Sequence, residues 1–251
     1  MQRIHQIVKK EQNIIRRFSN WSSFDIPSLP GWVDDEIIAR WQKFNFDLHY
    51  LPKISLERDM NLPLWKHKPD KIFYKKIAQG KISAESKNLQ GKWILIDARD
   101  KPKKMNRWIN SNDVKILEKI GLNPRKWLQK KNKQLYQNEY LVKILDNQGF
   151  FSRFCLSVGD IKGILPFVLD ILGIDSDQII RLPRFIEYNY LGNVFYPQWA
   201  STKTWEWFED KFEQKQNLAG GWKSVGSLAW DPPMFWSTIL SFRPLIEISA
   251  K

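Results

Sequence analysis

The feature that most constrains the fold is a series of short motifs within residues 181–244. In chain order they read Arg-Leu-Pro, Glu-Tyr-Asn-Tyr, Gly-Asn, Trp-Glu-Trp, Gly-Gly-Trp and Ser-Phe-Arg-Pro. The paired glycines, Gly220 and Gly221, mark a tight turn or a close approach of two backbone segments. Glu206 stands between two tryptophans, and a carboxylate buried there needs a charged or hydrogen-bonding partner. From the residues alone, the series predicts an aromatic-rich α+β core and indicates no particular ligand.

The order of these motifs resembles the C-terminal part of the formylglycine-generating-enzyme domain, a variant of the C-type lectin fold. That family typically shows Arg-Leu-Pro-x-x-x-Glu-Trp/Tyr-x-Tyr, Gly-Asn-x-x-Glu-Trp, Gly-Gly-Ser-Trp and Gly-Phe-Arg, with a helix before the first motif. The resemblance is strongest over residues 157–245. It implies an α+β chain with a C-type-lectin-like domain over residues 31–251, preceded by a basic N-terminal helix and loop over residues 1–30.

The spacing of apolar residues predicts the secondary structure around these motifs. Helical spacing predicts helices over residues 4–18, 33–44, 69–78, 113–120, 124–133 and 157–172. The last begins with a capping box of Ser157 and Asp160 and ends at Gly173. Alternating or compact apolar runs predict strands over residues 46–50, 93–96, 140–145 and 245–248, with 93–96 as a central strand and 245–248 as the final one. Pro183 suits a first helical turn, so a short helix that is buried on most sides is expected there.

The charge of the chain is unevenly distributed. Residues 1–135 hold 29 Lys and Arg against 14 Asp and Glu, whereas residues 136–251 hold 11 against 13. A basic half of this kind attracts polyanions such as nucleic acid or acidic lipid. An ordinary lysine-rich solvated surface has the same composition, so the sequence predicts at most weak, sequence-indifferent binding of DNA or RNA.

Other features bear on the cellular compartment. Cys155 is the only cysteine, so no internal disulfide can form. The basic N-terminal segment lacks the continuous apolar run of a signal peptide. No run reaches the ~20 apolar residues that a membrane-spanning helix needs. The sequence therefore predicts a cytoplasmic protein without a transmembrane segment.

The resembled family implies a catalytic centre whose residues this chain lacks. Its enzymes oxidise a substrate cysteine with a copper ion held by two cysteines in the interval that corresponds to residues 222–240, and this interval contains no cysteine. Soft Cu(I) needs soft ligands. A second branch, the iron-dependent sulfoxide synthases, needs clustered histidines, but His5, His49 and His67 are scattered. We therefore expect no catalytic residue and no cofactor.

Four acidic residues beside the tryptophans raise the possibility of a calcium site, since hard cations take several oxygen ligands. They lie in a segment that we expect to be a helix or turn, and comprise Glu206, Glu209, Asp210 and Glu213. A solvated helix face is the simpler interpretation of this spacing, and we predict no metal site.

Residues 222–240 are the best candidate for a binding segment. In the variable proteins of diversity-generating retroelements, which share the fold, this interval is the binding loop, and the chain is similar to them in its Trp-Glu-Trp-Phe, Gly-Gly and Ser-Phe-Arg-Pro-Leu framing. Rigid aromatic side chains supply contact area at low entropic cost. The candidate ligand-binding residues are Trp222, Lys223, Ser224, Trp230, Asp231, Phe235, Trp236 and Ser237. We expect the loop aromatics near the surface and Trp205, Trp207 and Phe242 in the core.

The same interval departs from those proteins in composition. Diversified positions arise from adenine-rich codons and tend to be Asn, Tyr, Ser or Asp, whereas here Trp, Pro, Met, Phe, Ile and Leu predominate. An apolar core strand therefore competes with a binding loop. Three hypotheses follow: a non-catalytic protein that binds a protein or small ligand, a nucleic-acid-associated protein that uses its basic half, and an enzyme of the same fold with another chemistry.

Overall fold

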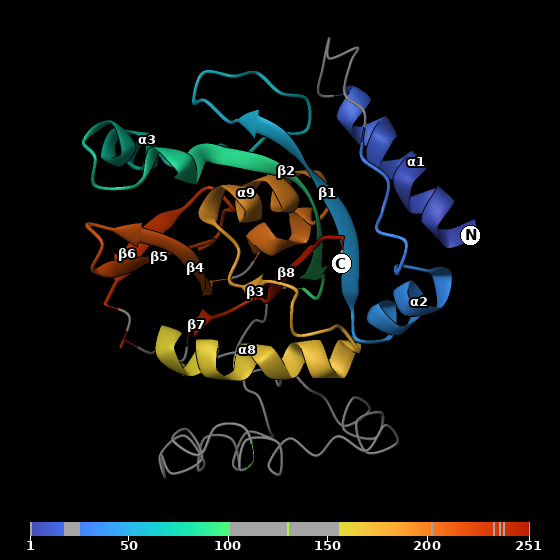
Figure 1. Cartoon of the computed structure of the whole chain (residues 1–251). Coiled ribbons are helices and arrows are strands. Elements are labelled where there is room, and N and C mark those ends of the chain that lie inside the picture. The colour runs from blue at the N-terminus through green and yellow to red at the C-terminus, as the bar shows by residue number, and fades with distance from the viewer. Residues whose placement is uncertain are drawn as a thin grey trace.

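Two four-stranded sheets and five α-helices make up the part of the chain that the computed structural model describes, namely residues 2–17, 26–100, 130, 156–201, 203–232, 234–235, 237 and 239–250 (Figure 1). The helices are α1 (Gln2–Arg17), α2 (Asp35–Lys43), α3 (Lys71–Ala78), α8 (Val158–Leu172) and α9 (Phe185–Val194), with 3₁₀ turns η1 (Ala84–Lys87) and η2 (Pro197–Ser201). The strands are β1 (Phe46–Ser55), β2 (Asn88–Asp97), β3 (Ile180–Arg181), β4 (Trp205–Phe212), β5 (Gln216–Gly220), β6 (Leu228–Asp231), β7 (Leu240–Ser241) and β8 (Leu245–Ile248). The α+β class is confirmed.

The first sheet has the order β1-β2-β8-β3 and is antiparallel throughout. Its central strand β2 contains the apolar run 93–96, as predicted, and all four of these residues are buried. β2 pairs with β1 from Asn88 to Asp97 and with β8 through Trp93 to Ile96. The final strand therefore lies inside the sheet, between a strand of the N-terminal half and β3.

The second sheet has the order β6-β5-β4-β7, with β7 parallel to β4 and the other pairs antiparallel. The prediction of a helix or turn around Glu206 was wrong, because residues 205–212 form strand β4. The buried side of β4 carries two carboxylates, Glu206 and Asp210, together with Phe208 and Phe212. These acidic residues break the apolar–polar alternation by which a strand is recognised in a sequence.

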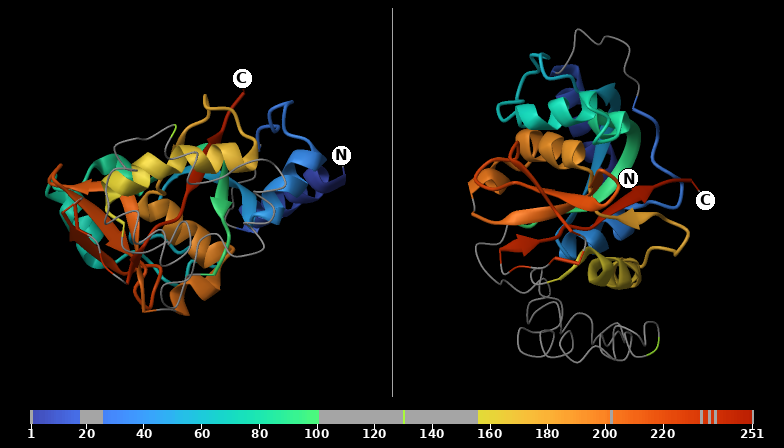
Figure 2. Two further views of the ribbon diagram at one scale, coloured as in Figure 1. Left: turned by 90° about the horizontal axis from the view of Figure 1, so that it is seen from below. Right: turned by 90° about the vertical axis from the view of Figure 1, so that its left-hand side faces the viewer.

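Helix α9 lies between the two sheets and contacts β2 of the first sheet and β4 and β5 of the second. Residues 185–192 are all buried, which confirms the expectation of a helix enclosed on most sides. Pro183 is not in the first helical turn, however, because the helix begins at Phe185, with Arg184 as its N-cap. Figure 1 shows α9 between the two sheets, and the right-hand view of Figure 2 shows α3 on its upper side.

Helix α8 covers the other side of the fold, along the lower edge in Figure 1. Its predicted capping box forms, since the Ser157 hydroxyl accepts from the Asp160 amide at 3.2 Å while the Asp160 carboxylate accepts from the Ser157 amide at 3.0 Å. Gly173 ends the helix with φ +66°, the left-handed conformation that glycine adopts readily. The apolar side of α8 packs into a core cluster shared with α2 and β1.

The basic N-terminal helix α1 packs against α2 and β1. Glu11, although charged, is buried at this contact and lies 2.9 Å from Nδ1 of His49 on β1. Within the described residues, none of the helices has the length and apolar character needed to cross a membrane. The predicted helices over 113–120 and 124–133 and the strand over 140–145 lie outside the described residues, Lys130 apart.

Candidate functional site

The short motifs of residues 181–244 contact one another in the core. Arg243 of the Ser-Phe-Arg motif is fully buried and forms a two-pronged ion pair with Glu206 of Trp-Glu-Trp, at 3.0 Å from Nε and 2.9 Å from Nη2. Its Nη1 donates to the carbonyl oxygens of Asp97 and Arg99, and its guanidinium lies 3.8 Å from the centroid of the Trp199 ring. Glu206 thus has the charged partner that its position requires.

A second ion-pair cluster joins the Arg-Leu-Pro motif to α9. Glu187 accepts from Arg181 at 2.7 and 2.8 Å and from Nη2 of Arg184 at 3.0 Å. Burial favours a raised pKa for Glu187, but the two arginines outweigh it and lower the pKa to about 2. Arg181 also bonds Glu247 on β8, so this cluster ties α9 to the first sheet.

Asn189 of the Tyr-Asn-Tyr motif bonds the segment that follows Gly-Gly-Trp. Its Nδ2 donates to the carbonyls of His67, at 2.8 Å, and Val225, at 3.0 Å, while its Oδ1 accepts from the Trp65 indole at 2.6 Å. Gly226 follows Val225, and its carbonyl accepts from the amide of Asp70 at 2.8 Å. These motifs therefore hold the fold together, and a site must be sought beside them.

The predicted ligand-binding residues divide into two groups at opposite ends of β4. Trp222 stacks on Trp205 where β4 begins, with ring centroids 5.6 Å apart. Trp230 stacks on Phe212 where β4 ends, with centroids 4.5 Å apart. Seven residue steps separate the two ends, which is roughly 23 Å along a strand. The described residues among these candidates therefore do not form one compact site.

At the first end, the turn after Gly221 is held by its own hydrogen bonds. Ser224 is half-buried, and its hydroxyl accepts from the Gly226 amide at 3.1 Å. Lys223 is exposed and has φ +55°, an unusual conformation for a residue with a side chain. Ser237 is half-buried, and its hydroxyl accepts from the Ile239 amide at 3.3 Å. These serines support the backbone of the turn and the loop.

At the second end, Trp230 is half-buried and Lys76 of α3 lies beside its ring, with Nζ 5.6 Å from the centroid. Asp231 is also half-buried, and burial raises the pKa of its carboxyl. Both residues belong to strand β6, so this part of the interval is neither a loop nor a buried core strand. The aromatic–lysine contact was missed at the sequence level because Lys76 and Trp230 lie far apart in the chain.

The β6–β7 loop, residues 232–239, carries the most exposed apolar side chains of the interval. Met234 is 84% exposed, Phe235 is 45% exposed and Ile239 is 37% exposed. Trp236 lies outside the described residues. The expected burial of Trp207 and Phe242 is confirmed, whereas Trp205 is only half-buried.

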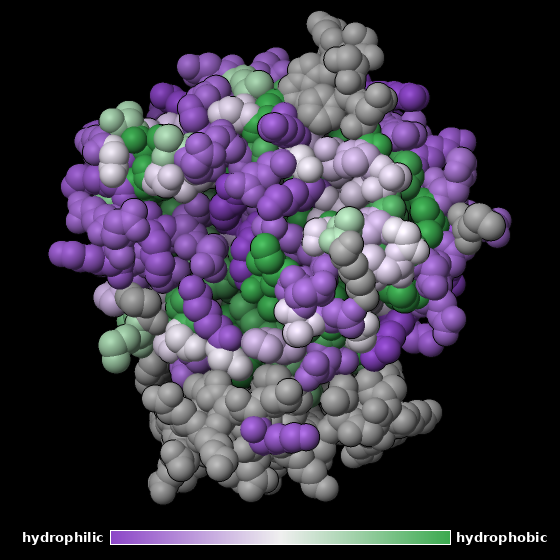
Figure 3. Space-filling model, viewed as in Figure 1, coloured by the Kyte–Doolittle hydropathy of each residue, from purple (hydrophilic) through white to green (hydrophobic). Residues whose placement is uncertain are grey.

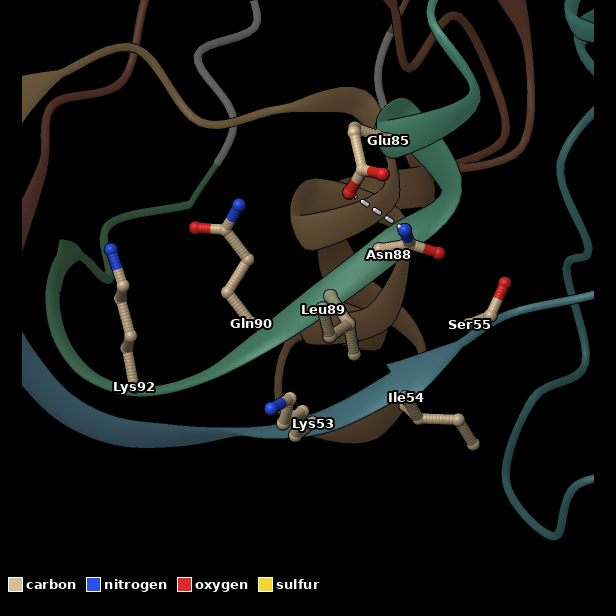
Figure 4. A pocket seen from close by; sticks show the side chains of 8 residues that line it. All are labelled: Lys53, Ile54, Ser55, Glu85, Asn88, Leu89, Gln90 and Lys92. Carbon is tan, nitrogen blue, oxygen red and sulfur yellow. Dashed lines mark hydrogen bonds between the residues drawn. The ribbon is translucent and has the colours of Figure 1, made fainter.

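A hollow of about 510 Å³ lies over the paired strands β1 and β2 beside η1 (Figure 4). Gln90 and Lys92 project from β2 to the same side, and Glu85 of η1 lies across from them. The Glu85 carboxylate accepts a hydrogen bond from the side-chain amide of Asn88 at 2.8 Å. The Lys92 ammonium donates to the Glu247 carboxylate at 2.6 Å. Lys92 is thus already paired with a carboxylate, and Glu85 is already hydrogen-bonded to a neutral amide. No sequence signal indicated it, because strand pairing alone brings these residues together.

The four acidic residues considered for calcium point to separate partners. Glu206 pairs with Arg243, and Asp210 accepts from the Phe185 amide at 2.6 Å. Glu209 and Glu213 pair with different lysines, Lys162 and Lys81. Within the described part of the chain, no group of three or more His, Cys, Asp or Glu is placed to hold a metal ion.

No protein-family model, no curated protein and no solved structure matches the chain. Its function has to be inferred from the contacts within the chain itself.

Proposed function

We propose that the protein binds a protein partner without catalysis, through the β6–β7 loop (residues 232–239) and the neighbouring turn at 222–224. The observation that carries this proposal is the exposure of the loop. Five large apolar residues are exposed among the described residues. Three of them, Met234, Phe235 and Ile239, belong to this loop and lie within a stretch of six residues. Single exposed apolar residues are ordinary, but a group of them marks an interaction surface.

The chemistry of the loop favours an apolar protein surface as the partner. Met adapts to irregular contacts, and a partly exposed Phe offers a rigid anchor. A sugar would need converging polar groups, whereas the serines nearest the loop already bond to backbone amides. The absence of a cysteine pair from residues 222–240 supports a role without copper-dependent thiol oxidation.

We further propose that the scaffold is a C-type-lectin-type fold related to the formylglycine-generating family. Residues within or next to these motifs that lie 36 and 37 positions apart form buried hydrogen bonds, as Asn189 does with Val225 and Glu206 with Arg243. Such pairing supports a common origin for the whole set of motifs rather than chance matches. If the chain is a retroelement target, the neighbouring DNA contains a reverse-transcriptase gene and a near-copy of the final coding segment. Sequencing that region tests this part of the proposal.

The binding proposal is tested with peptides selected from a random phage-displayed library against the folded protein. We expect Phe235→Ala to weaken the selected peptides about tenfold or more, as a central aromatic contact typically does. Ile179→Ala is the matched control, because Ile179 is 56% exposed but lies just before β3. Thermal melting should show both variants folded. Peptides that bind Phe235→Ala and Met234→Ala as tightly as the parent protein would show that the loop is not the binding surface.

A further inference from the structure

The far end of β4 brings two aromatic rings and several lysines together. Phe212 and Trp230 stack with an interplanar angle of 16°. Nζ of Lys76 lies 5.4 Å from the Phe212 centroid and 5.6 Å from the Trp230 centroid, and Nζ of Lys81 lies 5.7 Å from the Phe212 centroid. We call these four residues the lysine–tryptophan cluster.

The two distances from Lys76 are almost equal, although the ring centroids are 4.5 Å apart. The ammonium group therefore lies alongside the stacked pair and does not cap the outer face of Trp230. Phe212 is only 7% exposed, whereas Trp230 is half-buried. Phe212 thus supports Trp230 from one side, and Trp230 is the ring nearer to solvent.

The backbone holds Trp230 in place. It lies on β6, the edge strand of the second sheet in the described residues, and pairs with Leu218 of β5. Adjacent residues of a strand point to opposite faces, so the carboxylate of Asp231 points away from the face that carries Trp230. A ring fixed by stacking and strand pairing loses little conformational freedom when a ligand packs on it.

The charge around the cluster is positive. Glu213 bonds Lys81 of the cluster at 2.6 Å, with both side chains over 40% exposed. The pKa of Glu213 is lowered, first by that hydrogen bond and then by the charges of Lys81, Lys76 and Lys215. Three lysines thus surround one carboxylate, and hydrophilic side chains predominate over this side of the face in Figure 3.

A nucleotide within a single strand matches these features. It has a flat ring that can stack on Trp230 and a phosphate that can lie beside Lys76 and Lys81. Base–aromatic stacking with lysines along the backbone is the usual mode of binding to single strands, whereas bases in a duplex are already stacked on each other. An acidic peptide offers charge but lacks the ring. We propose that the lysine–tryptophan cluster binds single-stranded nucleic acid, with one base on the outer face of Trp230. This site is separate in residues and chemistry from the β6–β7 loop.

The test is fluorescence anisotropy with a labelled 20-nucleotide oligo-dT and the full chain, at salt concentrations from 50 to 200 mM. We expect Trp230→Ala to weaken binding by about fivefold or more, as loss of one stacked base does, and Trp230→Phe to restore most of it. Lys76→Ala should make the dependence of log K on log salt shallower by about 0.7, as loss of one phosphate contact from a single strand does. Trp222→Ala and Lys53→Ala are the matched controls and should bind like the parent chain.

Further arms of the experiment distinguish the possible ligands. The oligonucleotide should bind more tightly than a 20-base-pair duplex, free thymidine monophosphate or polyglutamate of similar charge. Equal binding of polyglutamate, or unchanged binding by Trp230→Ala that melts like the parent protein, overturns the proposal. Should Trp230→Ala fail to fold, Lys76→Ala with an unchanged salt slope overturns it independently. Phe235→Ala should leave oligonucleotide binding unchanged, so the proposal for this site is tested independently of the proposal for the loop.

Discussion

Removing either partner of the Glu206–Arg243 pair should destabilise the protein severely. Both side chains are fully buried, and Arg243 uses three of its nitrogens in bonds to Glu206 and to two carbonyls. Burial favours a lowered pKa for Arg243, but Glu206 and Asp97 outweigh it and the guanidinium stays charged. Glu206→Gln therefore leaves a buried cation without its closest counter-charge, and Arg243→Met leaves a buried anion.

We expect each single substitution to cost about 3–5 kcal/mol of unfolding free energy, the usual result of breaking a buried pair. Against a total of about 5–15 kcal/mol, this is a large part of the stability. The double variant Glu206→Gln/Arg243→Met should cost about 2 kcal/mol less than the sum of the two, because neither charge is then left alone. Urea unfolding followed by tryptophan fluorescence and by circular dichroism measures all three variants.

The exposed pair Lys81–Glu213 provides the control. Its two side chains are 42% and 47% exposed, so Glu213→Gln should leave the unfolding free energy nearly unchanged. If the two buried substitutions are equally mild, or if their costs simply add in the double variant, the pair does not act as a buried ionic contact and the reasoning fails.

Three further outcomes are expected. Burial raises the pKa of Asp210 to about 6, so the folded state holds this proton more tightly than the unfolded chain. The unfolding free energy should therefore rise by about 1 kcal/mol from this group between pH 7 and pH 5, and Asp210→Asn should abolish that rise. A Cβ at Gly226 would lie 2.1 Å from the Lys68 carbonyl oxygen, whereas one at Gly31 would meet nothing within 4 Å. Gly226→Ala should therefore lower the melting temperature by several degrees, and Gly31→Ala should leave it nearly unchanged. Trp207→Ala should cost about 3–5 kcal/mol, as expected of a fully buried tryptophan, and retention of near-parental stability would contradict its place in the core.

Local signals in the sequence predicted several elements correctly. Three of them are strand 93–96, the final strand and the capped helix after Ser157. The pattern that predicts each one lies within a few consecutive residues. Strand β4 was mistaken for a helix or turn because Glu206 and Asp210 occupy its buried side, where apolar residues are normally found. Arg243 and the Phe185 amide are among the partners that stabilise these buried carboxylates.

The candidate binding segment was predicted as a continuous stretch, but the fold separates it. Strand β6 takes Trp230 to one end of β4, and the loop then returns to Ile239, whose carbonyl accepts from the Trp205 amide at 2.7 Å at the other end. The contact of Trp230 with Lys76 depends on α3, more than 130 residues earlier in the chain. Charge counts for the N-terminal half could indicate many lysines there, yet they could not indicate which of them meet an aromatic ring.

The central place of β8 affects how the protein must be synthesised. Roughly 150 residues separate the end of β2 from β8. At a synthesis rate of about 5–20 residues per second, β8 is therefore made about 7–30 s after β2. During that time residues 93–96 present unpaired backbone groups to any passing chain, the condition under which strands add to one another. The middle of the finished sheet is thus an open edge of the nascent chain, and slower translation of residues 98–244 should increase aggregation during synthesis without changing the stability of the folded protein.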